Sequence, residues 1–544
     1  MSKVSTPSPA LLRRDLLAAA GAGLVGFGAG VTVADELNDI NYKVETVITP
    51  EKFGAAGDGV TDDTTAITDM FAAAAGKTVI FSSKTYITGA QTPPANCIIV
   101  MQPGCVLKDS GVLGASDRLL NLTNDNIIII AWRAKLEIDR SDYTTGEQRH
   151  CVHISNSSDV SVFGLGVEDV GGAGAAGDGF YLGGSGAVAV RTMLRGVWSK
   201  NCYRNGISIT NARDFLIEDA FLELTNGTNP EAGLDVEPNG PTDVIRGKIA
   251  RLKTLNNTGM GIEISIANLD NTSEAVELLI EDHISVGDNR GIRVQNNTVT
   301  PVSGRIVLNR PVSDSPHKSG LNIFNYTKNG PRLIAIDPHV LNPNQSAGTD
   351  INDNSAIALY NQGIAEDEGG NVAILRPVVR DDAGNLNTNV RPIVVRSGGL
   401  KWDNVDIEFP EVTGHASADP WNIDTTAKGV RLHNDLRRYR AAHTADFNVT
   451  DGRYFGRIIT NEGASGTITA TLPATSEATV GWRYTFLVMS AFEFRIDPNG
   501  TDLIRGGTAG QYLVSSTIGD TFTIECDAAG SWRIVEHVGT RNFV

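Results

Sequence analysis

The chain has 544 residues and a formal net charge of −17, and it contains 58 glycines but only 6% aromatic residues. Because nonspecific nucleic-acid binding depends on basic patches, and Lys and Arg form no block here, we expect no nucleic-acid partner. No apolar run reaches the length of a membrane-spanning helix, so we expect no membrane insertion. Abundant small residues favour closely spaced turns over one large core.

The N-terminal region contains three short blocks. Leu12–Leu17 is Leu-Arg-Arg-Asp-Leu-Leu, Gly23–Phe27 is Gly-Leu-Val-Gly-Phe, and Thr32–Leu37 is Thr-Val-Ala-Asp-Glu-Leu. An arginine pair ahead of an Ala/Gly-rich apolar run is typical of a twin-arginine export signal. The three blocks in this order also resemble the segment that precedes the β-helix in bacteriophage tailspikes. We therefore expect residues 1–45 to form a virion-attachment or linker segment, with secretion or export to the periplasm as the alternative.

A turn-rich segment and a short helix come next. Phe53–Asp63 is rich in Gly and Asp and ends in a helix N-cap. The helix that follows places apolar side chains on one face and ends at Gly76, ahead of strands at 78–81 and 85–88. This order resembles the entry of the pectate-lyase-like superfamily, in which the helix caps the N-terminal end of a right-handed parallel β-helix.

The central part of the chain repeats. Six glycines, each followed by an apolar-polar-apolar triplet, are spaced 27, 27, 28, 30 and 29 residues apart. They are Gly179, Gly206, Gly233, Gly261, Gly291 and Gly320. A fixed period of this length, built from short alternating strands, is typical of a stacked solenoid. We therefore predict an all-β fold, a right-handed single-stranded parallel β-helix over residues 46–435 with a catalytic groove.

The pattern changes towards the C-terminus. Segments 356–359 and 392–395 look like further coils, and a basic stretch around 437–440 looks like a linker. From about Phe447 onwards, turns containing Gly separate strands in the manner of a meander. Residues 440–544 resemble the small C-terminal β-domains of tailspikes, and we expect a β-sandwich that serves trimerisation or carbohydrate binding.

One outward column of the β-helix concentrates acidic residues. Because equivalent positions of neighbouring coils stack about 4.8 Å apart, the second residue after each glycine forms a ladder on the outer surface. This ladder comprises His153, Tyr181, Ser208, Asp235, Glu263, Arg293 and Asn322. The adjacent outward column comprises Ser155, Gly183, Thr210, Glu237, Ser265, Gln295 and Phe324. The alignment predicts that Asp235, Glu237 and Glu263 meet on one exposed patch.

Such a patch suits glycoside hydrolysis. Neighbouring carboxylates raise the pKa of at least one of them, and a protonated carboxyl beside an ionised one is the pair that glycosidases use. We expect Glu263 or Glu237 as general acid and Asp235 as base or nucleophile. We expect five other residues of the ladder to bind substrate: His153, Tyr181, Ser208, Arg293 and Asn322. Polar loops at 171–178, 226–232 and 268–274 would wall the groove.

Other interpretations of the same residues remain open. Single outward polar residues on a β-helix are usually only solvated, and Arg293 would then merely neutralise Glu263. The acids would hold Ca²⁺ in a polysaccharide lyase, where Arg293 or His153 would abstract the proton. Since no long Asp-rich calcium constellation is evident, we favour the hydrolase without metal or cofactor. Five scattered cysteines without paired spacing argue against zinc and against a disulfide framework.

The resemblance to tailspikes implies a function. It implies an endo-depolymerase of bacterial surface polysaccharide, either O-antigen or capsule, that assembles as a homotrimer. It also implies a place in the virion tail, attached to a tail or baseplate protein through the N-terminus. The alternatives are a polysaccharide lyase, a non-catalytic receptor-binding spike and an exported bacterial carbohydrate enzyme.

Overall fold

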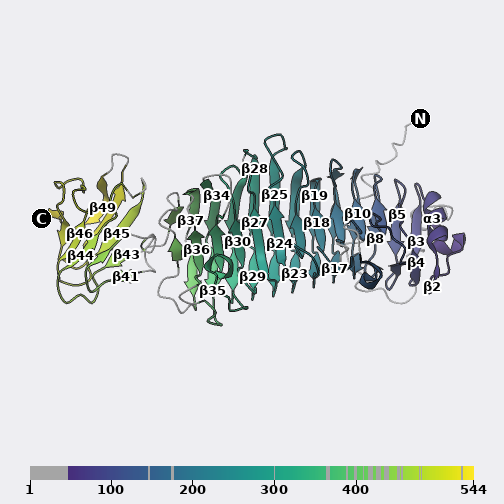
Figure 1. Ribbon diagram of the computed structural model, residues 1–544, viewed down its shortest axis with the longest axis horizontal. Helices are drawn as coiled ribbons and strands as arrows, with labels where there is room; N and C mark the ends of the chain where they lie inside the picture. Colours follow the sequence, from purple (N-terminus) through teal and green to yellow (C-terminus); the bar gives the residue numbers. More distant parts are fainter. Residues whose placement is uncertain are drawn as a thin grey trace, which may run out of the picture.

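Three parallel sheets wind into a β-helix along most of the chain (Figure 1). The computed structural model describes residues 47–544 except 145–147, 173–176, 299, 363–367, 387–389, 397–400, 409, 415–420, 424–429, 434–439, 450–453, 455–457, 477, 479–480 and 528–530. Within these residues the three sheets have 16, 11 and 13 strands, and the strands within each of them pair in parallel with those of the neighbouring coils. The predicted right-handed parallel β-helix is confirmed.

The 11-stranded sheet carries the predicted ladder, and we call it the ladder sheet. Its strands are β7 (Leu120–Leu122), β10 (Val152–Ile154), β14 (Phe180–Leu182), β18 (Ile207–Ile209), β21 (Leu234–Val236), β24 (Met260–Ser265), β27 (Arg290–Gln295), β30 (Leu321–Phe324), β33 (Ile357–Tyr360), β36 (Ile393–Arg396) and β39 (Trp421–Ile423). The coils predicted at 356–359 and 392–395 therefore exist as β33 and β36.

The other two sheets complete each coil. The 16-stranded sheet holds β1 (Val47–Ile48), β3 (Thr78–Phe81), β5 (Ile98–Met101), β8 (Ile128–Ile130), β11 (Ser157–Ser158), β12 (Ser161–Phe163), β15 (Ala189–Val190), β16 (Met193–Arg195), β19 (Ala212–Glu218), β22 (Ile245–Ala250), β25 (Val276–Glu281), β28 (Gly304–Asn309), β31 (Arg332–Ile336), β34 (Glu368–Leu375), β37 (Lys401–Glu408) and β40 (Val430–His433). The 13-stranded sheet holds β2 (Asp58–Asp62), β4 (Thr85–Thr88), β6 (Val106–Asp109), β9 (Lys135–Glu137), β13 (Gly166–Glu168), β17 (Trp198–Lys200), β20 (Phe221–Glu223), β23 (Lys253–Leu255), β26 (Ile284–Val286), β29 (Val312–Asp314), β32 (His339–Leu341), β35 (Val378–Arg380) and β38 (Glu411–Thr413).

The repeated glycines are explained by the close approach of successive coils. A Cβ atom on Gly206 would lie 2.6 Å from the carbonyl oxygen of Gly233, and one on Gly233 would lie 2.8 Å from that of Gly261. Any side chain at this column would therefore push the coils apart. The apolar residues of each triplet, such as Ile262 and Ile264, point into the β-helix and are buried.

The N-terminal end is capped as predicted. Helix α3 (Thr64–Ala72) buries Ile67, Met70 and Phe71 against the first coil. The carboxylate of Asp63 accepts backbone N–H bonds from Ala56 at 2.6 Å and Gly57 at 3.1 Å, which fixes the turn ahead of the helix. The described residues also include the 3₁₀ turns η2 (Pro50–Phe53) and η3 (Arg140–Asp142) and the short helix α4 (Ile351–Asn354).

One corner of the β-helix carries alternating charges. Successive coils place Asp219, Arg251, Asp282, Arg310, Asp337 and Arg376 there, all with positive φ. Each Asp pairs with the Arg of the next coil, with Nε–Oδ1 distances of 2.7, 2.8 and 2.6 Å. These exposed pairs align the coils at a turn where most L-residues are strained.

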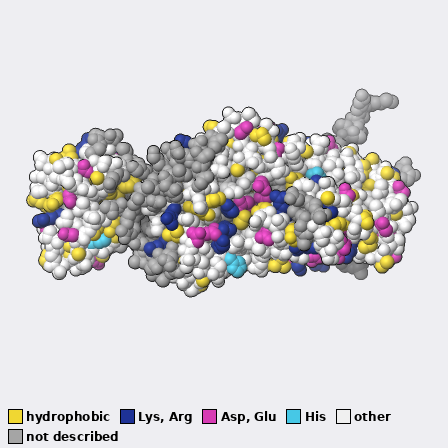
Figure 2. All heavy atoms as spheres, viewed as in Figure 1, with side chains coloured by type: hydrophobic (Ala, Val, Ile, Leu, Met, Phe, Trp, Pro, Cys, Tyr) yellow, Lys and Arg dark blue, Asp and Glu magenta, His cyan; other side chains and the backbone are white. Residues whose placement is uncertain are grey.

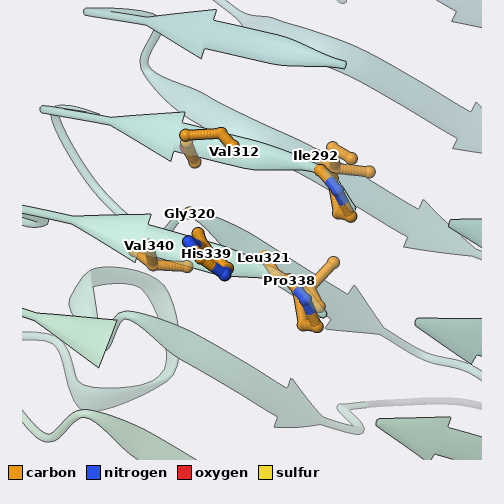
Figure 3. Close-up of a pocket in the computed structure, with 9 residues that line it drawn as sticks. Ile292, Val312, Gly320, Leu321, Pro338, His339 and Val340 are labelled. Atoms are coloured by element: carbon orange, nitrogen blue, oxygen red, sulfur yellow. The ribbon is translucent and has the colours of Figure 1, made fainter. Parts of the chain in front are cut away.

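A small apolar gap between coils is shown in Figure 3. It is lined by residues of β27, β29, β30 and β32, among them Ile292, Val312, Leu321 and Val340, and has a volume of about 10 Å³. A gap of this size holds at most one water molecule, and its walls offer little to bind one. It is a feature of packing and takes no ligand.

The C-terminal region forms two five-stranded sheets, separate from the β-helix in Figure 1. One contains β41 (Arg440–Ala442), β43 (Ile458–Thr460), β45 (Arg483–Leu487), β48 (Thr521–Cys526) and β49 (Trp532–Val538). The other contains β42 (Phe447–Asn448), β44 (Ile468–Thr471), β46 (Phe494–Asp497), β47 (Leu513–Ser515) and β50 (Asn542–Phe543). The two sheets agree with the predicted sandwich, but the predicted meander is wrong for the first half. Because strands β41 to β46 alternate between the sheets, β43 pairs in parallel with β41 and β45.

Several sequence predictions fall outside the described residues. These are the N-terminal segment 1–45 and most of the predicted linker at 437–440. The five cysteines are buried and free. Among the described residues, no helix is both long and apolar enough to cross a membrane.

Candidate active site

The ladder sheet aligns the predicted column in the predicted register. Asp235 pairs with Ser208 on one side and with Glu263 on the other, and Glu263 pairs in turn with Arg293. The column continues in both directions through His153 paired with Tyr181, Tyr181 with Ser208, and Arg293 with Asn322. All eight residues predicted for catalysis or binding therefore lie on one outer face, with Glu237 directly after β21.

The predicted exposure of this column is wrong. Asp235 is 2% exposed, Glu263 3%, and Ser208, Tyr181 and Asn322 are buried as well. These side chains point away from the interior of the β-helix, but neighbouring loops cover them. The two carboxyl groups are therefore held in a low-dielectric environment, where ionisation is costly.

The acids share a cavity of about 370 Å³, which we call the acid cavity. Asp235, Glu237, Glu263 and Arg293 contribute to its wall, together with Ser265 and Gln295 of the adjacent column. The remaining wall residues are Arg204, Asn229, Pro230 and Met260. Acidic and basic side chains stand side by side near the middle of the β-helix in Figure 2, on the side that faces the viewer in Figure 1.

Asp235 is the most strongly perturbed acid of the cavity. Burial raises its pKa well above the usual value, and the nearby charges of Glu237 and Glu263 raise it further. Asn205 donates an amide N–H bond to one carboxyl oxygen of Asp235 at 3.2 Å, while the other oxygen has no hydrogen-bond partner. This environment favours the protonated form of Asp235.

Glu263 titrates in a different range. Burial raises its pKa to about 7, although the charges of Arg293 and Arg290 oppose the effect. The guanidinium Nε of Arg293 lies 3.8 Å from a carboxyl oxygen of Glu263, which is an ion pair but too long for a hydrogen bond. The guanidinium of Arg293 also lies 4.7 Å from the centre of the Phe324 ring.

Arg204 is a second cation of the cavity. Its guanidinium lies 3.5 Å from Glu237. Burial would lower the pKa of Arg204, but the charges of Asp178, Asp235 and Glu237 raise it overall. Two guanidinium groups thus flank the acids, which disfavours a divalent cation between them. Among the described residues, no group of three or more His, Cys, Asp or Glu is arranged to hold a metal ion.

His153 lies apart from the acids. It lines another cavity of about 370 Å³, three strand spacings from Asp235 along the ladder sheet. Its ring nitrogens contact the Asn121 side chain at 2.9 Å and the Gly183 carbonyl at 3.1 Å, and burial lowers its pKa to about 4. Between the cavities, the Tyr181 hydroxyl accepts a hydrogen bond from Asn239 at 3.0 Å, and its ring stacks on His150.

Ser208 and Asn322 are part of the scaffold around the acids. The Ser208 hydroxyl accepts a hydrogen bond from Asn205 at 3.1 Å, so it helps to fix the amide that contacts Asp235. The Asn322 amide lies 3.4 Å from the carbonyl oxygen of Asn352. Neither residue belongs to the wall of the acid cavity.

Sequence reasoning missed a second functional column. The residues immediately before the repeated glycines include Asp178, Asn205 and Arg290, each of which acts on a residue of the acid cavity. Arg204 precedes Asn205 and lies on a loop, outside both strand columns. The signal was present in the repeat, because the residues directly before Gly179, Gly206 and Gly291 are polar, in the coils on either side of the two that carry Asp235 and Glu263.

No family model matches the chain. Over 68 residues, 12% of this chain, it is 47% identical to a capsule-specific depolymerase of Klebsiella phage K5-2, and the match covers 8% of that protein. Over 303 residues it is 26% identical to the uncharacterized protein YclG of Bacillus subtilis, which covers 49% of this chain and 50% of that protein. The chain thus matches no more than half the length of these relatives.

Solved structures share the fold. The family 28 exopolygalacturonase of Yersinia enterocolitica superposes with a TM-score of 0.52 at 13% identity, covering 72% of this chain and 79% of that one. The tailspike of Escherichia coli bacteriophage HK620 gives a TM-score of 0.50 at 11% identity, covering 88% and 87%. These likenesses support the right-handed parallel β-helix derived above.

Proposed function

We propose that this chain is a phage tailspike depolymerase, which binds a bacterial surface polysaccharide, O-antigen or capsule, and cleaves it by glycoside hydrolysis. One observation carries the proposal: three carboxyl groups and two guanidinium groups line a single cavity on the outer face of the β-helix. The partial identity to a phage capsule depolymerase and the tailspike-like fold support the biological setting.

The acids have distinct roles in this proposal. Asp235, kept protonated by burial and by its neighbours, donates a proton to the glycosidic oxygen as the bond to the leaving sugar breaks. Glu237, paired with Arg204, supplies the carboxylate that activates water or attacks the sugar. Burial and the charge of Glu237 are the main causes that hold the proton on Asp235, and Glu263 adds to them when it is ionised. This proposal differs from the sequence prediction, in which Asp235 was the base or nucleophile and Glu263 or Glu237 the general acid, because burial raises the pKa of Asp235.

Hydrolysis suits this cavity better than β-elimination. Elimination needs a base beside the sugar. His153, one expected base, lies three strand spacings from Asp235, and Arg293, the other, lines the cavity but forms an ion pair with Glu263 at 3.8 Å. If the enzyme is instead a lyase with Ca²⁺, chelation abolishes activity and the products absorb ultraviolet light. A hydrolase gives reducing ends without that absorbance and is insensitive to the chelator.

Asp235→Asn tests the proposal. On a panel of purified O-antigens and capsular polysaccharides, the wild type should shorten at least one polymer, as measured by size-exclusion chromatography and reducing ends. The variant should lose about a thousandfold in kcat, the magnitude of general acid catalysis, and keep its affinity for the polymer. Asp214→Asn, a surface carboxylate paired with Arg246, is the matched control. Unchanged cleavage by Asp235→Asn, or by a variant lacking all three acids, would show that the catalytic groups lie elsewhere. Binding of a polymer by the wild type without any shortening, unchanged in the variant lacking all three acids, would indicate a non-catalytic receptor-binding spike.

The assembly is part of the same proposal. By its likeness to tailspikes, the chain forms a homotrimer in the virion tail, attached to a tail or baseplate protein through residues 1–45. Residues 440–544 then serve trimerisation or carbohydrate binding. The molar mass of the purified protein by light scattering, with and without residues 440–544, tests the trimer and separates these two roles. An exported bacterial enzyme would instead lose its first residues during secretion.

A further inference from the structure

We infer that the second cavity, around Arg118, binds a sugar carboxylate of the substrate, so that the enzyme selects acidic polysaccharides. This inference rests on the proposed function and specifies its substrate class. The cavity has a volume of about 370 Å³ and is lined by Arg118, Asn121, His153, Ala90, Thr92, Ser116, Asp117 and Thr123. It is as large as the acid cavity.

Arg118 provides the positive charge of this cavity. Its side chain is half-buried, its Nε atom is buried without a hydrogen-bond partner, and its nearest polar contact is the Gln148 side chain at 3.5 Å. Asp117 stands next to it, but one oxygen of that carboxylate accepts the Gly114 backbone N–H at 2.8 Å. Among the described residues, Arg118 forms no ion pair within 4 Å.

The other walls fix the chemistry of the ligand. His153 is held between Asn121 and the Gly183 carbonyl, and its lowered pKa of about 4 makes it neutral at pH 7. The cavity therefore offers the guanidinium of Arg118, neutral hydroxyl and amide groups, the carboxylate of Asp117 and no second cation. A planar guanidinium matches a carboxylate, which accepts two parallel hydrogen bonds.

The position of the cavity points to the same chain that enters the acid cavity. His153, Tyr181, Ser208 and Asp235 occupy successive coils of one outward column, so His153 and Asp235 are three strand spacings, roughly 14 Å, apart. An extended polysaccharide running along the axis reaches both cavities. Because the protein carries a net charge of −17, an anionic polymer is repelled elsewhere, and local cations are needed to admit it.

Arg118→Gln tests the inference. The probes are purified capsular polysaccharides that contain uronate, each used as isolated and after chemical reduction of its carboxyl groups to alcohols. For the polymer that the wild type cleaves, the variant should raise KM about tenfold, the effect of losing one charge-assisted hydrogen bond, with kcat within twofold. On the reduced polymer, wild type and variant should have the same KM. Arg133→Gln removes the same charge from an exposed turn between β8 and β9 and should change nothing.

Binding measurements distinguish failure of the proposed carboxylate site around Arg118 from failure of the proposed hydrolytic activity. The affinity of Asp235→Asn for the same polymers, measured by calorimetry, does not require cleavage. The inference is supported if Asp235→Asn binds the acidic polymer tightly and this binding is lost on carboxyl reduction or in the Asp235→Asn/Arg118→Gln double variant. This holds even if the wild type cleaves nothing and the enzymatic proposal fails. Equal affinity for native and reduced polymer, an unchanged affinity of the double variant, or no binding to any acidic polymer overturns it.

Discussion

The titration of Glu263 gives a stability effect that Glu263→Gln should remove. The side chain is 4% exposed, and burial raises its pKa from 4.5 to about 7. The folded protein therefore retains this proton over a pH range in which the unfolded chain has lost it. The stabilisation is complete below about pH 4.5 and is lost as the pH rises through 7. Since one pKa unit corresponds to about 1.4 kcal/mol, the loss amounts to about 3 kcal/mol.

The assay compares urea unfolding of wild type and Glu263→Gln at pH 5 and pH 8. Between pH 5 and pH 8, the free energy of unfolding of the variant should rise by about 3 kcal/mol relative to that of the wild type. The loss of the partner of Arg293 changes the stability of the variant by the same amount at both pH values and does not affect this comparison. Glu281→Gln is the control, because the pKa of Glu281 is shifted in the opposite direction: an ion pair with Lys248 at 2.7 Å lowers it. Its stability difference from wild type should stay constant between pH 5 and 8. A constant difference for Glu263→Gln over the same range would refute the account of the buried carboxyl.

Three further predictions concern the loop that lines the acid cavity, the charged corner of the β-helix and the type of cleavage reaction. A Cβ atom on Gly259 would collide with the Pro230 carbonyl oxygen, so Gly259→Ala should displace the wall of the acid cavity that contains Pro230. The KM of this variant should rise at least tenfold. An unchanged KM would show that this wall does not contact substrate. Asp282→Asn should lower Tm by no more than a few degrees, because it removes a surface pair with Arg310, and a decrease that persists in high salt would contradict this. Chelator should leave polymer cleavage within twofold of the untreated rate, measured as new reducing ends, whereas complete loss would favour the lyase.

The scaffold was predictable because its cause is local and repeated. At each of the first five repeated glycines a Cβ atom would strike the carbonyl oxygen of the next repeated glycine, so the sequence directly reflects the close spacing of the coils. The alternation of the triplets then fixes which residues face outward. For this reason the register of Asp235 with Glu263 and of Glu263 with Arg293 was correct.

The cover of the site was not predictable, because it depends on contacts between distant segments. Arg140 donates to the Asn226 carbonyl at 2.8 Å and to that of Asn201 at 3.0 Å, and so connects loops 86 and 61 residues away. These contacts hold the start of the loop whose residues Asn229 and Pro230 line the acid cavity. No periodic signal marks Arg140. The pairing of β43 with β41 was missed for a similar reason, since alternation between two sheets leaves the same strand pattern as a meander.

The repeat that builds the scaffold also enforces the electrostatics of the site. Asp235 and Glu263 are neighbours because their backbones pair across adjacent strands, so the two carboxyl groups cannot separate without breaking the β-helix. The favourable free energy of stacking many coils offsets the unfavourable free energy of burying two neighbouring carboxyl groups. On a loop, the same two groups would move apart instead. A single residue inserted within Leu234–Val236 would turn Asp235 inward and disperse the cluster, because strands alternate with a period of two. Two of the acids thus stand on paired strands of the ladder sheet, whereas the proposed selection for acidic polymers depends on Arg118, which lies outside the strands.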